Sequence, residues 1–252
     1  MKRTASLLQL EAWALAAWPA LEQSEYDGWV LRFAEGHTKR ANSVNPLYPT
    51  TIGVEEKIAV CEEAYAERGL PTIFRLTPFC EPSNLDDVLA ERGYERVDRT
   101  LVMTRSLDAP DVPPDLGAHN AVRCVDLATW LDAFETLDLL PPESISTRCR
   151  IVGRIPSETI PTMADPADSP LGMNLGVRDG RAVGLFALFV AERARRTGLG
   201  RALVTETLRI AADRGATLAY LQVEEENGAA RRLFDELGFQ PIYPYWYRIE
   251  GQ

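Results

Sequence analysis

Two stretches of this chain present the same structural signals in the same order. In each, a helix, an Arg-Gly pair, a strand, a second helix, a Gly-aromatic pair and a final strand follow one another. The glycines that end the helices, Gly69 and Gly93 in the first stretch and Gly215 and Gly238 in the second, lie 24 and 23 residues apart. Glycine commonly ends a helix because it adopts the left-handed backbone without strain. A repeat in fixed order favours a duplicated α/β unit, although any alternation of helices and strands shares part of this rhythm.

The segment between the two stretches is rich in residues that interrupt regular structure. Residues 108–117 contain three prolines, three aspartates and a glycine, which cannot continue a helix or a central strand. We therefore expect a first domain over residues 1–108, a linker over 109–119 and a second domain over 120–252.

Periodicity and turn residues predict the elements of both halves. The first half is expected to hold helices over 7–21, 54–68 and 84–92, the last capped by Ser83, and strands over 28–34, 38–44, 71–77 and 94–107. The second is expected to hold helices over 127–137, 142–155, 199–214 and 227–237, and strands over 121–125, 173–177, 181–190, 217–223 and 239–249. The segment 156–170, rich in Pro, Ser, Thr and Asp, is expected to be a long loop near a site.

The composition restricts the partners that we expect. The net charge of −10 argues against nucleic acid, because a phosphate backbone requires a basic face, and weakly favours a cationic or amine-bearing acceptor. No apolar run reaches about 18 residues, so no membrane-spanning segment is expected, and the N-terminus lacks a convincing signal-peptide cleavage site. The four cysteines form no CxxC pair and histidines are scarce, so we expect no metal site and a cytoplasmic protein with reduced thiols.

A basic, glycine-containing loop joins a predicted strand to a predicted helix near residue 195. The N–H groups of a helix N-terminus have no intrahelical partner and suit a pyrophosphate. Gly198 and Gly200 allow phosphates to approach the backbone, and Arg195, Arg196 and Arg201 can add charge-assisted contacts. The loop is not a P-loop, since GxxxxGK followed by Ser or Thr is absent. Nor is it a dinucleotide-binding loop, since Leu stands at position 203 where that pattern requires Gly.

The arrangement Arg195-x-x-Gly198-x-Gly200 resembles the Gln/Arg-x-x-Gly-x-Gly/Ala motif of the GNAT acetyltransferases. By itself this pattern recurs by chance in roughly one of every few chains of this length, since glycine is about 7% of residues. The context makes it specific: a strand precedes it, and a helix and strand follow it. The run from Asn227 to Phe239 then resembles the family's second conserved segment, in the expected order. The resemblance covers about residues 120–250.

The resemblance implies an α/β fold of two GNAT-like mixed, twisted sheets flanked by helices, with acetyl-CoA as co-substrate. The pantetheine arm of acetyl-CoA would enter where the strand before the loop diverges from its neighbour. The implied cofactor-binding residues are Leu188, Phe189, Val190, Arg195, Arg196, Thr197, Gly198, Leu199, Gly200, Arg201, Asn227 and Phe234.

The catalytic groups are less clearly marked. Many GNAT enzymes place a tyrosine that protonates the leaving thiolate where this chain has Phe234. The candidate replacements are Tyr243, Tyr245 and Tyr247 in the aromatic tail near the C-terminus, and of these we select Tyr245. Such residues also pack across strands. Glu224, after a predicted strand, is our candidate for the base that accepts the proton of the amine, with a solvated acidic turn as the alternative.

The first half lacks the basic loop. Residues 28–46 resemble the N-terminal part of a bacterial group of tandem GNAT-like proteins, in which the degenerate half packs against the active half. Arg40, Asn42 and Ser43 cluster in a predicted strand and are candidates for lining an acceptor pocket, or form an outward polar face.

Together these features predict a cytoplasmic N-acetyltransferase that moves an acetyl group from acetyl-CoA to a primary amine by direct attack. The acceptor is expected to be a small molecule or a peptide. A non-catalytic sensor of acetyl-CoA and a transferase that uses a longer acyl-CoA are the alternatives, and a homodimer is left open.

Overall fold

The computed structural model describes residues 2–107, 122–135, 142–164 and 170–251. Its helices are α1 (Lys2–Ala17), α2 (Val54–Ala66), α3 (Leu85–Glu91), α4 (Leu127–Glu135), α5 (Pro142–Val152), α6 (Leu199–Asp213) and α7 (Gly228–Glu236), with 3-10 turns η1 (Lys39–Ala41) and η2 (Glu192–Ala194). Its strands are β1 (Glu22–Tyr26), β2 (Trp29–Phe33), β3 (Val44–Pro46), β4 (Ile73–Leu76), β5 (Tyr94–Ser106), β6 (Val122–Cys124), β7 (Glu158–Ala164), β8 (Gly172–Asp179), β9 (Ala182–Val190), β10 (Leu218–Glu224) and β11 (Gln240–Glu250).

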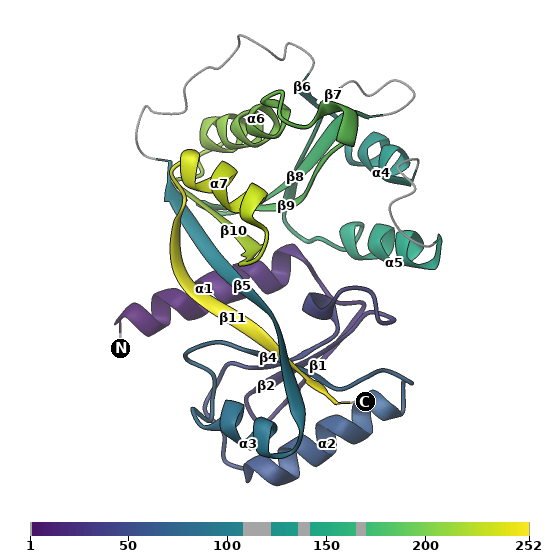
Figure 1. The fold of residues 1–252 in the computed structure, drawn as a ribbon, viewed down its shortest axis with the longest axis vertical. Helices are drawn as coiled ribbons and strands as arrows, with labels where there is room; N and C mark the ends of the chain where they lie inside the picture. The colour runs from purple at the N-terminus through teal and green to yellow at the C-terminus, as the bar shows by residue number, and fades with distance from the viewer. Residues whose placement is uncertain (1, 108–121, 136–141, 165–169, 252) are drawn as a thin grey trace.

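The strands form one mixed sheet in the order β1-β2-β3-β4-β11-β5-β10-β9-β8-β7-β6. The last strand of each half is paired with the other half. β5 lies against β10 of the second half, and β11 lies between β4 and β5 of the first. Figure 1 shows these two long strands side by side, running from one half of the molecule into the other. The halves are therefore joined by an exchange of strands.

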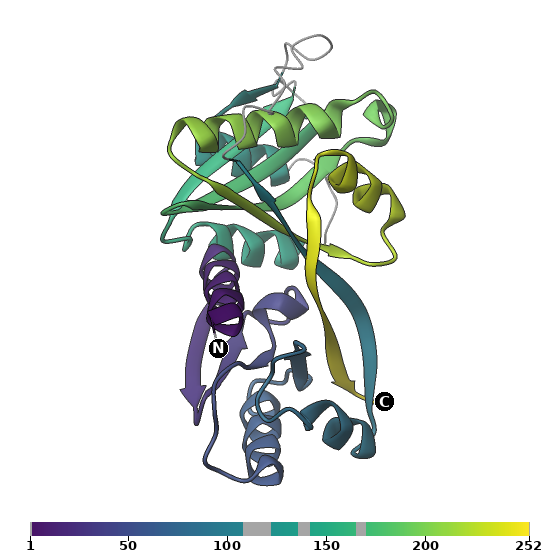
Figure 2. The same ribbon diagram turned by 90° about the vertical axis from the view of Figure 1, so that its left-hand side faces the viewer.

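Helices cover both faces of the second half's part of the sheet. α6 and α7 pack on one face, where Val183, Leu185 and Leu221 are buried. α1 packs with α4 and α5 on the other, against Leu175 and Phe186. Because α1 belongs to the first half, that half also contributes a helix to the core of the second. Figure 2 shows α6 at one end of the molecule and α2 at the other.

The α/β class, with a mixed sheet and flanking helices, is confirmed. The two expected sheets are joined into one because β5 and β11 each pair across the boundary. The division into two domains stays a prediction, and the expected linker, 109–119, lies outside the described residues. Helix ends at the four glycines are confirmed, since Gly69, Gly93, Gly215 and Gly238 all have positive φ.

Four local predictions are wrong. The helix expected over 7–21 ends at Ala17, and β1, which was not predicted, begins at Glu22. The strand expected over 38–44 is the turn η1, because the Asn42 amide bonds the loop backbone: Oδ1 accepts from Ala34 N at 2.7 Å and Nδ2 donates to His37 O at 2.8 Å. The loop expected over 156–170 contains β7, where Pro161 is tolerated because its missing N–H would face β6 rather than β8. The N-cap of α3 is Asn84 rather than Ser83.

A buried ion pair lies where β11 crosses the first half. Arg75 of β4 binds Glu11 of α1, with its Nη2 donating to Oε1 at 3.0 Å, and both side chains are at most 1% exposed. The hydroxyl of Tyr243, on β11, donates to the same Oε1 at 2.5 Å. The Arg75 guanidinium also stacks 3.8 Å from the ring centroid of Tyr245. This network therefore links α1, β4 and the exchanged strand.

We predict that Arg75→Met lowers the free energy of unfolding by about 3–5 kcal/mol, because it leaves the Glu11 carboxylate buried without a counter-charge. The double variant Glu11→Leu, Arg75→Met should lose less than the single variant, since no charge is then left unpaired. Urea unfolding followed by tryptophan fluorescence measures both. Arg92→Met, which removes exposed pairs with Glu55 and Glu62, is the control and should cost at most about 1 kcal/mol. An equal loss in Arg75→Met and Arg92→Met would contradict this account.

Candidate functional site

The two central parallel strands of the second half separate at one end. β9 and β10 pair only from Leu218–Ala182 to Leu221–Leu185. Beyond that point β9 continues to Val190 and β10 to Glu224, while their outer neighbours β8 and β5 stay paired with them. Beyond that point, the edges of β9 and β10 that face each other are therefore not paired with each other. An open strand edge of this kind can accept an extended ligand through main-chain hydrogen bonds.

A bulge in β9 lies at the beginning of this opening. The register against β8 shifts between Met173 and Leu175, and Ala187 has φ +49°. A β-bulge bends its strand and leaves a residue out of the ladder. Of the residues predicted here, Leu188 lines the opening, whereas Phe189 and Val190 pair with β8 and do not line it.

The basic loop leads from β9 into α6 as expected. Gly198 is the N-cap of α6, with φ +87°, and provides no side-chain cap. Gly200, in the first turn, has room: an added Cβ would lie 3.4 Å from Leu233 Cδ2 and 3.5 Å from Val190 Cγ2, which are ordinary contacts. Packing within the protein therefore does not require glycine at position 200. The N-terminus of α7, by contrast, is capped by Asn227, whose Oδ1 accepts from Ala230 N at 3.1 Å.

The side chains of this loop make different contacts. Arg195 and Arg196 are exposed, and Arg195 Nε donates to Val190 O at 3.3 Å. Thr197 donates to Ala194 O at 2.7 Å and so supports the turn. Arg201 pairs with Glu236 of α7, so its guanidinium ties the two helices together. Leu199 is buried in the core beneath the loop.

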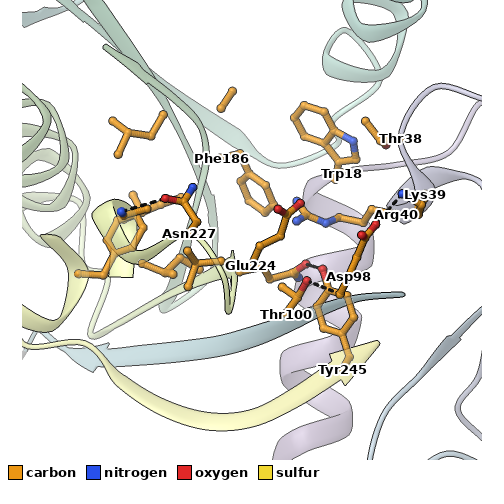
Figure 3. Close-up of a pocket in the computed structure, with 18 of the residues that line it drawn as sticks. Trp18, Thr38, Lys39, Arg40, Asp98, Thr100, Phe186, Glu224, Asn227 and Tyr245 are labelled. Atoms are coloured by element: carbon orange, nitrogen blue, oxygen red, sulfur yellow. Dashed lines mark hydrogen bonds and ion pairs between the residues drawn. The ribbon is translucent and has the colours of Figure 1, made fainter. Parts of the chain in front are cut away.

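The opening between β9 and β10 leads into a cleft of about 540 Å³ between the two halves. Asn227, the N-cap of α7, and Phe234 of α7 line it beside the open strand edges, and Phe234 also packs against Phe239. Figure 3 shows side chains from both halves directed into this space. The first half provides Trp18, Thr38, Lys39, Arg40, Asp98 and Thr100.

Three polar residues form a row across the exchanged strands. Glu224 of β10 is opposite Thr100 of β5, and Thr100 is opposite Tyr245 of β11. Directly opposed residues of neighbouring strands share a face of the sheet, with their Cβ atoms about 5 Å apart. All three line the cleft. The exchange of strands therefore brings Tyr245 and Glu224, the two candidate catalytic residues, into one site.

Tyr245 has an unusual electrostatic setting. Its hydroxyl donates to Gln222 Oε1 at 3.0 Å, and its side chain is buried. Burial alone would raise the pKa of Tyr245, but the charges of Arg40 and Arg75 outweigh it and hold the pKa below its ordinary value. Burial and the adjacent Tyr245 raise the pKa of Tyr247. The two nearby guanidinium groups thus favour the ionised form of the Tyr245 phenol.

The residues predicted to bind the acceptor are only partly brought together. Arg40 lines the cleft. Asn42 and Ser43 do not, because both are buried behind η1, where Asn42 holds the loop backbone. The sequence analysis missed Trp18, Thr100 and Arg148, which reach the cleft from the residue after α1, from β5 and from α5. No local pattern marks them, since they come from separate elements that meet only in the folded chain.

Neither a metal site nor a membrane span is found among the described residues. No group of three or more His, Cys, Asp or Glu side chains in that part of the chain could hold a metal ion. No described helix combines the length and the apolar character that a membrane crossing requires.

Comparisons with known proteins agree with this architecture. Residues 4–247 match the family described as "Probable histone acetyltransferase Rv0428c C-terminal". An "Uncharacterized N-acetyltransferase YobR" of Bacillus subtilis is 33% identical over 246 residues, covering 96% of this chain and 98% of its own. Among solved structures, a "GCN5-related N-acetyltransferase from Kribbella flavida" has a TM-score of 0.66 at 17% identity, covering 97% of this chain and 93% of its own.

A "Tandem GNAT protein from the clavulanic acid biosynthesis pathway" has the same fold, with a TM-score of 0.60 at 16% identity over 79% of this chain and 70% of its own. The family match spans both halves and the exchanged strands, rather than the second half alone. The chain therefore belongs to the Rv0428c C-terminal acetyltransferase family and is a GNAT-type N-acetyltransferase.

Proposed function

We propose that this enzyme transfers an acetyl group from acetyl-CoA to a primary amine by direct attack. The observation that carries the proposal is the separation of β9 and β10 next to the uncapped N-terminus of α6. The open edge of β9 suits the amides of the pantetheine arm, and the α6 N-terminus suits the pyrophosphate. Room at Gly200 and the exposed Arg195 and Arg196 fit the same ligand.

The chemistry assigned to this chain's own residues is proton transfer and positioning. The nitrogen of a neutral amine attacks the thioester carbonyl carbon, the C–S bond breaks, and one proton must leave the nitrogen while the thiolate gains one. Glu224 is the base for the first proton, acting through water. Tyr245 is the acid for the second, in place of the tyrosine that Phe234 replaces. A backbone N–H of the bulged strand would stabilise the oxyanion.

The acceptor is a small molecule or a peptide that bears the amine. We also propose a cytoplasmic location, which the four free cysteines support, since none of them is paired with another.

The Gly200→Asp variant tests the cofactor site. A carboxylate in the first turn of α6 would occupy the space expected for the pyrophosphate and repel it. We expect calorimetry to show at least about tenfold weaker acetyl-CoA binding, with the melting temperature little changed because a Cβ fits there. Gly53→Asp is the matched control, since Gly53 is the N-cap of α2 and nothing lies within 4 Å of an added Cβ. Equal affinity of both variants and the wild type would refute the cofactor site.

The Glu224→Gln variant tests the base. The glutamine keeps the shape of the side chain but cannot accept a proton, so kcat should fall about 100-fold at neutral pH. Glu226→Gln is the matched control, because Glu226 is exposed in the same turn and does not line the cleft. Glu225 is unsuitable, since it pairs with Arg99, whose hydrogen bond lowers the pKa of Glu225. Similar kcat values for the two variants would remove Glu224 from the mechanism.

The Tyr245→Phe variant tests the acid and the non-catalytic alternative together. It removes the hydroxyl but keeps the ring stacked on Arg75, so kcat should fall at least about 100-fold while acetyl-CoA still binds. Adding Phe234→Tyr to this variant restores a hydroxyl at the usual family position and should recover part of the activity. Unchanged kcat in Tyr245→Phe would dismiss this acid. Binding of acetyl-CoA by the wild type without turnover of any amine would favour the sensor.

A further inference from the structure

The wall of the cleft that faces β9 and β10 carries two guanidinium groups that no carboxylate neutralises. Arg40 comes from η1 of the first half, and Arg148 from α5 of the second. Neither forms an ion pair within the part of the chain that the structure describes. Lys39 also lines the cleft, but its Nζ lies 2.5 Å from the Asp98 carboxylate, which cancels its charge.

Arg148 has aromatic and neutral surroundings. Its Nε donates to His37 Nε2 at 3.3 Å, and its guanidinium lies 4.6 Å from the ring centroid of Phe134 and 5.9 Å from that of Trp18. Burial and the charge of Arg148 lower the pKa of His37 to about 4, so this imidazole is neutral at neutral pH. Burial lowers the pKa of Arg148 to about 10, so the guanidinium keeps its charge at neutral pH. It therefore has no counter-charge from its described neighbours.

Arg40 is similarly placed on the other side of the aromatic pair Trp18–Phe186, whose rings stack 5.8 Å apart. Its guanidinium lies 5.8 Å from the Phe186 centroid, and its buried Nε has no hydrogen-bond partner. Its contact with Tyr245 is with a phenol rather than a carboxylate. Figure 3 shows Arg40 and Glu224 entering the cleft from opposite sides.

The interior behind this wall adds positive charge. Arg32 is fully buried, and its guanidinium donates to three backbone carbonyls, those of Arg40, Leu15 and Trp18, rather than to a carboxylate. Arg75 is neutralised by Glu11. In a chain with a net charge of −10, this side of the cleft thus has an excess of cations. Buried cations without partners are costly, and a bound anion offsets that cost.

We propose that the acceptor carries an oxyanionic group, a carboxylate or a phosphate, in addition to the amine. The anion binds Arg148 and Arg40 beside Trp18 and Phe186, and this directs the amine toward Glu224. Guanidinium groups bind both oxyanions through charge-assisted, bidentate hydrogen bonds. This inference rests on the proposed amine acetylation at the same cleft.

The test compares matched pairs of amines in the presence of coenzyme A. Glycine, β-alanine and phenylalanine are paired with their carboxamides, and O-phosphoethanolamine with ethanolamine, so that the two arms separate carboxylate from phosphate. Calorimetry measures binding, and release of free thiol from acetyl-CoA measures transfer. We expect at least one anionic member to bind about tenfold or more tightly than its neutral partner. Arg148→Gln should remove that preference.

Arg150→Gln is the matched control, because Arg150 lies on the same helix but is exposed and pairs with Glu35. Neutral members that bind as tightly as anionic ones, no binding in any pair, or an unchanged preference in Arg148→Gln would each overturn the inference. If Arg148→Gln does not fold, the wild-type preference alone decides. Preferential binding of the anionic member without transfer would support this inference and contradict the proposed reaction. Equal transfer to both members of a pair would support the proposed reaction and contradict this inference.

Discussion

The pairing of β5 with β10, and of β11 with β4 and β5, is the constraint on which the rest of the molecule depends. Each half gives its last strand to the other, so the backbone hydrogen bonds at the centre of the sheet belong to both. The network of Glu11, Arg75 and Tyr243 joins the same elements through side chains. The cleft between the halves is consequently lined by strands of one continuous sheet.

The two halves contribute different parts of the cleft. The second half has the open strand edge and the glycine-containing loop, which serve the proposed cofactor. The first half has no such loop, and it contributes the opposite wall of the cleft instead, with Trp18, Arg40 and Thr100. The first half therefore shapes one side of the cleft and provides β5 to the shared sheet.

The sequence predicted those features that local physics determines. Glycines with positive φ end the helices where expected, and the loop at Gly198 precedes α6. The exchange of strands could not be predicted. The pattern of residues along β11 indicates a strand, but it does not indicate which strands β11 pairs with. For the same reason the sequence did not show that Glu224 and Tyr245 lie in one row across the strands, although both residues had been predicted to be catalytic. The turn at η1 was missed because the Asn42 amide, a single side chain, holds it.

Amide hydrogen exchange of the intact protein, with and without acetyl-CoA, tests the central claim most directly. Here the claim is that the cofactor lies along the open edge of β9 and at the α6 N-terminus, in a cleft closed by the first half. The account predicts slower exchange with acetyl-CoA at residues 187–190 and 198–201, and little change in the remote helix α2. Protection confined to other elements, or none at saturating acetyl-CoA, would contradict it.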